Sequence, residues 1–122
     1  MTPPPVIALS SKAALLTADW SPRIIARMNN YDFKVVTVQG TFIWHRHAET
    51  DETFIVLEGA MQIEFRDGIV ELNEGDMIVV PKGIEHRPRA DARCSVLVIE
   101  PTGTVNTGDA GGPLTAPDEA WI

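Results

Sequence analysis

The sequence predicts an all-β protein with a single domain, in which short antiparallel strands close into a barrel or into two packed sheets. Short apolar runs alternate with turn residues from residue 23 to residue 101. Nine glycines and nine prolines recur along the chain, as in a domain with many turns. The length of 122 residues suits one domain with a core of its own. Closure into a barrel leaves few strand edges open.

Residues 1–22 are expected to form an N-terminal arm that precedes the barrel. Its first eleven residues are rich in proline and serine and are predicted to be loose. Between Lys12 and Trp20 the composition allows a short helix, for which Ser10 or Ser11 would serve as the N-cap.

The barrel is placed at residues 23–101. Asn29-Asn30 and Asp67-Gly68 are turn signals, and the second favours a tight hairpin. Most neighbouring strands are therefore expected to pair as sequential hairpins. The eight expected strands are residues 23–28, 33–38, 41–47, 53–58, 61–65, 69–72, 76–80 and 94–100.

Residues 102–122 are rich in glycine, proline and threonine, so we expect an irregular C-terminal tail. Trp121 lies near its end. A large aromatic residue there suggests that the tail is held against the barrel or against a partner chain.

Composition narrows the possible partners. The formal net charge of −7 disfavours nucleic acid and anionic membrane surfaces. There is no apolar run long enough for a transmembrane helix and no recognisable signal peptide, so a cytoplasmic protein is expected. Cys94 is the single cysteine, which excludes an intrachain disulfide. It precedes an apolar run and is interpreted as a small buried residue rather than a nucleophile.

The stretch WHRHAETDE, residues 44–52, holds two of the three histidines. Side chains alternate along a strand, so His45 and His47 are expected to share one face, where two imidazoles can chelate one ion. His86 lies far along the chain, after Pro81-Lys82-Gly83. These three side chains are the candidate nitrogen ligands.

A carboxylate from the same stretch could complete the ligand set. Glu52 is preferred over Glu49 and Asp51, because it lies where the polar loop becomes the apolar run TFIVLE and is carried on rigid backbone. The alternative is that the histidines are packed or solvated and that the acids are solvated. Against it, all three histidines fall in two segments of similar design, each with a glycine, a short apolar run and then the histidines.

These segments resemble the two motifs of the cupin superfamily, in small single-domain bacterial cupins. The spacing Gly40-x4-His45-x-His47-x4-Glu52-x6-Gly59 is similar to the first motif, and Gly75-x5-Pro81-x-Gly83-x2-His86 to the second. The tail EPTGTVNTGD, residues 100–109, is also similar to such proteins. Two positions depart from the pattern, neither of them a ligand in the family. The first gap, from Gly40 to His45, is one residue short, and Ala90 stands where the second motif commonly has asparagine.

The resemblance implies a jelly-roll barrel with a divalent transition metal in its mouth, bound by His45, His47, Glu52 and His86. The alternative is a cupin barrel whose site is empty or structural. Three imidazoles and a carboxylate suit Fe, Mn, Ni, Cu, Co or Zn without choosing among them. An octahedral ion would keep two adjacent positions open for a substrate or dioxygen, whereas a tetrahedral zinc site would be closed.

For function, we expect a metal-dependent enzyme acting on a small organic molecule, with a dioxygenase favoured over an isomerase or lyase. The alternative is a non-catalytic module that binds a small ligand such as a sugar derivative. A structural or storage role is a third possibility, which the small size of the chain makes less attractive.

Phe54 and Val56 are expected to share the face of Glu52, and Ile43 that of His45, as an apolar wall. Arg87 and Arg89 are expected to be solvated charges at the rim, and the alternative is that they attract an anionic substrate to the mouth.

The opposite face of the predicted strand 41–47 bears on assembly. Phe42 and Trp44 are both expected to point out of the barrel, where large apolar groups need cover. Because small cupins are commonly dimers, we expect a homodimer.

Overall fold

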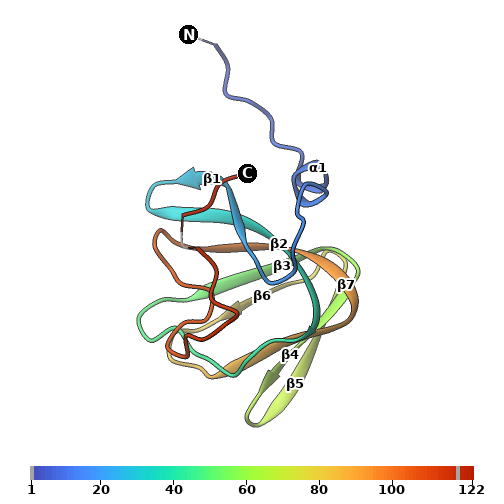
Figure 1. Cartoon of the computed structure of the whole chain (residues 1–122), viewed down its shortest axis with the longest axis vertical. Helices are drawn as coiled ribbons and strands as arrows, with labels where there is room; N and C mark the ends of the chain where they lie inside the picture. The colour runs from blue at the N-terminus through green and yellow to red at the C-terminus, as the bar shows by residue number, and fades with distance from the viewer. Residues whose placement is uncertain (1, 118) are drawn as a thin grey trace.

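The computed structural model describes residues 2–117 and 119–122. Its regular structure is antiparallel strand apart from one short helix, in agreement with the predicted all-β jelly-roll class (Figure 1). No helix in the described ranges is long and apolar enough to cross a membrane. The elements are α1 (Leu9–Ala13), β1 (Arg23–Met28), β2 (Tyr31–Thr41), β3 (Glu52–Glu58), β4 (Ala60–Phe65), β5 (Gly68–Asn73), β6 (Met77–Val80) and β7 (His86–Pro101).

Strand β7 organises the barrel, because it is long enough to pair with three other strands. The main path through the sheet is β1-β2-β7-β3-β6. Among the described strands only β1-β2 and β4-β5 pair as sequential hairpins, so the expectation that most neighbours do so is wrong. Residues 94–101 of β7 pair with the first part of β2, and residues 86–89 pair with β4, which in turn pairs with β5. The pairing of β2 with β7 shifts register between Val38 and Gly40, and such a bulge bends a strand. The two ends of β7 thus belong to different parts of a curled sheet.

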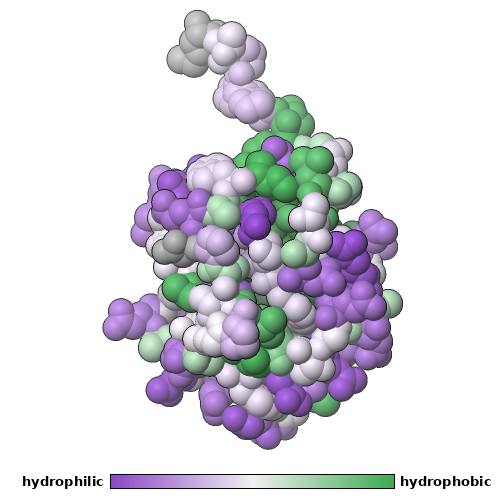
Figure 2. Space-filling model, viewed as in Figure 1, coloured by the Kyte–Doolittle hydropathy of each residue, from purple (hydrophilic) through white to green (hydrophobic). Residues whose placement is uncertain are grey.

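The sheet buries apolar side chains on both faces. Val36, Val96 and Phe54 belong to the core inside the barrel. Val35 and Leu97, the next residues along two of these strands, lie on the outer face. Leu16 and parts of the N-terminal arm cover that face, and hydrophobic side chains gather where the arm joins the body (Figure 2). Phe54 and Val56, which were predicted to form an apolar wall, both belong to this core.

The helix lies earlier than expected. It spans Leu9–Ala13, and its N-cap is Ala8, which makes no side-chain capping hydrogen bond. The predicted helix between Lys12 and Trp20 is therefore wrong in position, as is the predicted cap. Trp20 has a positive φ of 59° and its amide donates to the Thr37 carbonyl of β2 at 2.8 Å. A positive φ is incompatible with a right-handed helix, and the hydrogen bond attaches Trp20 to β2 in the barrel wall.

There are seven strands in the described ranges rather than eight. The predicted strand 41–47 is wrong, because β2 ends at Thr41 and the described residues after it pair with the sheet through an isolated bridge between His45 and His86 instead of a continuous strand. The predicted strand 94–100 is the second half of β7, which begins at His86. Cys94 is buried, as expected, and burial raises the pKa of its thiol to about 11.

The C-terminal tail is irregular, as predicted, and it is held on the first strand of its own chain. Trp121 forms a parallel bridge with Ile24, and the Arg27 guanidinium lies 5.2 Å from the centre of the Trp121 ring. Lys12 donates to the Ile122 carbonyl at 3.0 Å, which ties the arm to the tail. The division of the chain at residues 22 and 101 stays a prediction.

Candidate metal centre

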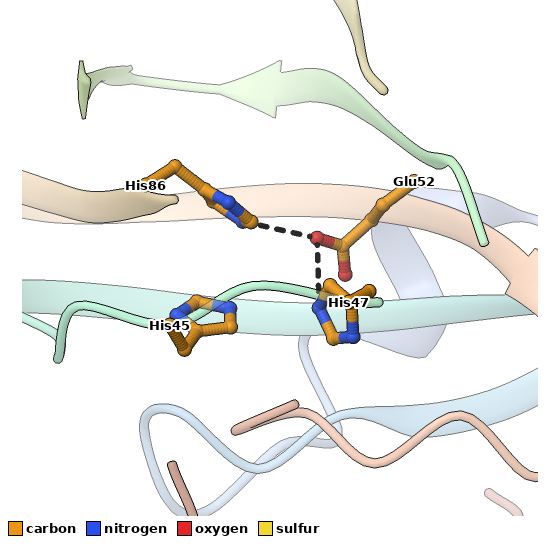
Figure 3. Close-up of side chains that lie close together, drawn as sticks. All are labelled: His45, His47, Glu52 and His86. Atoms are coloured by element: carbon orange, nitrogen blue, oxygen red, sulfur yellow. Dashed lines mark ion pairs between the residues drawn. The ribbon is translucent and has the colours of Figure 1, made fainter. Parts of the chain in front are cut away.

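The structure brings together the four side chains that the sequence singled out. His45 and His47 come from the connection between β2 and β3, Glu52 is the first residue of β3, and His86 is the first residue of β7. One ligand atom from each lies within 4.8 Å of all the others, and all four side chains are buried. They converge on one point (Figure 3).

Backbone hydrogen bonds place the two histidine segments side by side. His45 and His86 exchange amide-to-carbonyl bonds of 3.1 and 2.9 Å, and the Gly83 amide donates to the His47 carbonyl at 2.8 Å. Of the other candidate acids, Asp51 is exposed and accepts a hydrogen bond from the Lys82 amide at 2.9 Å. Glu49 is exposed as well. Asp51 therefore holds the loop, and the structure places Glu52 in the cluster.

A hydrogen bond to the carbonyl oxygen two residues earlier orients two of the imidazole rings. His45 Nδ1 lies 3.0 Å from the carbonyl oxygen of Ile43, and His86 Nδ1 lies 3.0 Å from that of Ile84. A carbonyl oxygen can only accept, so Nδ1 carries the hydrogen in both rings. In the neutral tautomer, Nε2 then keeps its lone pair, which is the form that ligates a metal.

The charge states suit metal binding. Burial lowers the pKa of His45 to about 4, so this ring is neutral at pH 7. Burial acts to raise the pKa of the Glu52 carboxyl, but its contacts with His47 and His86 outweigh burial and hold that pKa well below its usual range. An ionised carboxylate faces imidazoles that can supply lone pairs.

The cluster fits a divalent metal ion. Glu52 Oε1 lies 3.3 Å from His47 Nε2 and 3.4 Å from His86 Nε2. Among the described residues these three buried atoms have no hydrogen-bond partner. A buried polar atom without a partner costs roughly 1–3 kcal/mol, and a coordinated cation would satisfy all three together. The donor set does not select one transition metal.

The C-terminal tail supports the irregular histidine segment. Asp109 accepts a hydrogen bond from the Arg46 amide at 3.0 Å and its own amide donates to the Arg46 carbonyl at 3.1 Å. Gly108 passes so close that a Cβ built there would collide with the Arg46 carbonyl oxygen and lie 3.3 Å from the His45 ring. The tail thus fixes the segment that carries His45 and His47.

Phe42 and Trp44 do not both face outward, which corrects the prediction. Phe42 is buried, stacks on Trp20 with ring centres 4.7 Å apart, and meets the His45 ring edge-on at 5.3 Å. The strict alternation assumed for residues 41–47 fails because this segment is not in the sheet. The guanidinium group of Arg66 covers the Trp44 ring, with its Cζ atom 3.8 Å from the ring centre.

A narrow apolar pocket adjoins the cluster. Its empty volume, open mouth included, is about 470 Å³. Aromatic rings of Trp20, Phe42 and Phe54 line it, together with the polar side chains of His45, Glu52, Glu100 and Asn106.

Glu100 was missed by the reasoning from sequence. Thr53 of β3 pairs with Ile99 of β7, so the next residues, Glu52 and Glu100, are cross-strand neighbours. Burial and the Glu52 charge raise the pKa of the Glu100 carboxyl well above its usual range, against the opposing effect of Lys34. A signal existed in the sequence, because Glu100 shares the strand face of Val96 and Val98, where an acid is out of place.

The two arginines expected at the rim lie elsewhere. Arg87 donates to Glu64 at 2.7 Å, and Arg89 lies 3.5 Å from the same carboxylate. Both pair with strand β4, and neither is among the residues that line the described pocket.

Comparison with known proteins gives consistent results. The family model described as the cupin domain matches residues 34–100. A solved cupin-2 domain protein from Shewanella frigidimarina is 53% identical, with a TM-score of 0.78, over 79% of this chain and 94% of that one. An uncharacterized protein of Bacillus subtilis is 36% identical over 62% of this chain and 68% of its own length. Quercetin 2,3-dioxygenase of Bacillus subtilis is 36% identical over 69% of this chain, which spans only 27% of that enzyme.

Proposed function

The chain belongs to the cupin domain family, and on that basis we propose that it is a metal-dependent enzyme acting on a small organic molecule. The metal would be held by His45, His47, Glu52 and His86. The activity proposed is that of a dioxygenase, ahead of an isomerase or lyase.

One observation carries the metal proposal. Buried ligand atoms from four side chains lie within 4.8 Å of one another, and three of those atoms have no hydrogen-bond partner in the described part of the chain. Because the Nδ1 atoms of His45 and His86 bind backbone carbonyl oxygens, the Nε2 atoms of these two rings are free to bind a metal. A purely structural cluster would be expected to pair these atoms with one another or with backbone groups.

The pocket beside the cluster supports action on a small molecule. When bound, the metal would supply Lewis acidity and sites for substrate or dioxygen. The chain's own residues keep the ligands in place, and the stacked Trp20 and Phe42 rings form an apolar wall of the pocket beside the cluster. The apolar lining suits a small, flat, largely apolar molecule better than a sugar derivative.

The dioxygenase proposal draws on the similarity to quercetin 2,3-dioxygenase. That similarity covers 27% of the enzyme, so the enzyme's substrate is not carried over. A non-catalytic module that binds a small ligand is the second candidate, since the narrow pocket would hold such a ligand whether or not it reacts.

Metal content of protein purified without added metal or a His-tag tests the proposal. We expect one iron, manganese, nickel, cobalt, copper or zinc ion per chain in the wild type and in the Glu49→Gln control, and loss of the ion in His47→Ala and Glu52→Gln. Metal retained in the last two variants would contradict the ligand assignment. Consumption of oxygen with a panel of small aromatic compounds separates the enzyme from the binding module.

We also propose a homodimer. Met77 and Val79 of β6 are 62% and 49% exposed, and Met77 pairs with the half-buried Ile55 of β3 on the same outer surface. A second copy would cover this surface. Light scattering that shows a uniform monomer would contradict the proposal. The cytoplasmic location stays a prediction from sequence, which cell fractionation would test.

A further inference from the structure

Glu100 presents an unused oxygen atom to the pocket. Its side chain is only 1% exposed. Oε1 accepts a hydrogen bond of 2.9 Å from Lys34, whereas Oε2 is buried and has no hydrogen-bond partner among the described residues. Glu100 also lines the pocket beside the candidate metal centre. Buried polar atoms are nearly always hydrogen-bonded, so a buried carboxyl oxygen without a partner beside a pocket requires an explanation.

Lys34 fixes the direction of that oxygen. Its ammonium group is buried and donates to Glu100 Oε1 and, at 3.2 Å, to the carbonyl oxygen of Thr104. The contact with Lys34 therefore occupies one oxygen of the carboxyl group, and Oε2 is left to the pocket and to the neighbouring Glu52 carboxylate. Stability alone does not explain such a pair, because two apolar side chains of similar volume commonly serve as well or better.

The surroundings indicate what the ligand must look like. The pocket wall is apolar and includes three aromatic rings, and the space is narrow. The polar side chains of the wall other than Glu100 belong to the metal centre or, in Asn106, already bind backbone groups of the tail and of Trp20. Glu100 is thus the polar group of the wall that is left for a ligand.

We propose that Glu100 is a ligand-binding residue, which hydrogen-bonds the hydroxyl group of a small phenolic molecule bound between the aromatic rings and the metal centre. A hydroxyl group both donates and accepts, so it pairs with a carboxyl group in either protonation state. This inference rests on the proposed function for the presence of a substrate, but the contact with Glu100 does not itself require the metal.

Phenol and toluene are a matched pair of probes, since a hydroxyl replaces a methyl group of similar size. Calorimetry with metal-loaded and metal-free protein gives the ratio of the two affinities. In the double variant Lys34→Met, Glu100→Leu, which replaces the whole ion pair by apolar residues, we expect the preference for phenol to fall at least tenfold. In the control Arg87→Met, Glu64→Leu, which removes a buried carboxylate outside the pocket, the ratio is expected to stay as in the wild type.

Three outcomes would overturn the inference. These are an unchanged ratio in the Lys34 and Glu100 variant, no binding of either probe to the wild type, and a loss of metal in that variant, which would make Glu100 a support for Glu52. A wild type that binds no metal but shows the phenol preference would end the metal proposal and leave this one standing.

A measurement on the wild type covers the case in which the variant does not fold. The ¹³C resonance of the Glu100 carboxyl group is expected to shift when phenol is added and not when toluene is added. Equal responses to the two probes would contradict the inference.

Discussion

His86 begins a strand of 16 residues, whereas His45 lies on a segment that makes no continuous strand. Both rings are nevertheless oriented by the same contact, from Nδ1 to the carbonyl two residues earlier, at 3.0 Å. The sheet holds the backbone of His86. The backbone of His45 is held by its reciprocal hydrogen bonds with His86 and by the tail at Gly108 and Asp109. Orientation of a ligand is therefore local, but its position is set by whatever fixes the backbone.

The largest contrast is expected between His86→Ala and His47→Ala. Both should abolish metal binding, because each removes a ligand nitrogen. His86 is completely buried on β7, so its truncation leaves a cavity and should lower the free energy of unfolding of the metal-free protein by about 2–4 kcal/mol. His47 lies on the irregular segment, so its truncation should lower the free energy of unfolding of the metal-free protein by only about 1 kcal/mol. Chemical denaturation of both variants measures this, and equal losses would show that the two segments are equally rigid.

A second test breaks the support from the tail. Gly108→Ala should push the segment that carries His45 and lower metal affinity about tenfold, as loss of a supporting contact commonly does. Gly111→Ala is the matched control, because Gly111 has a similar φ of 63° against 55° and open space where its Cβ would stand. Titration with a competing chelator measures both affinities. Similar affinities in the two variants would mean that backbone strain, not the close approach, matters.

The four side chains of the cluster could be selected from the sequence more readily than the strands around them. The ligand spacing is local in each segment, so His45, His47, Glu52 and His86 could be identified without knowing the sheet. Glu100 left a weaker signal, as an acid on the strand face of Val96 and Val98, and only the pairing of β3 with β7 shows that it lies beside Glu52.

The missed half of β7 has a similar explanation. Residues 86–93 contain Pro88 and three arginines, which obscure the strand pattern. Pro88 pairs with Ile63 of β4, and its carbonyl accepts a hydrogen bond from the Phe42 amide at 2.9 Å. Tertiary contacts thus override the local preference of proline against strands.

The smallest effect is expected from Asp109→Ala. Its ion pair with Arg46 is exposed, with 3.4 Å between the charged atoms, and such pairs contribute little to stability. The hydrogen bond from the Arg46 amide is lost as well, so exchange of that amide with solvent should become faster while the amide of His86 is unaffected. Glu85→Ala, which breaks another exposed pair with Arg66, is the control. Unchanged exchange at Arg46 would show that the tail does not hold this segment.

Anomalous diffraction from crystals of the metal-loaded protein tests the central claim most directly. The account predicts one ion bound by Nε2 of His45, His47 and His86 and by the Glu52 carboxylate, with the Nδ1 atoms of His45 and His86 still donating to the carbonyls of Ile43 and Ile84. An ion at another place in the chain, or bound through those Nδ1 atoms, would contradict it.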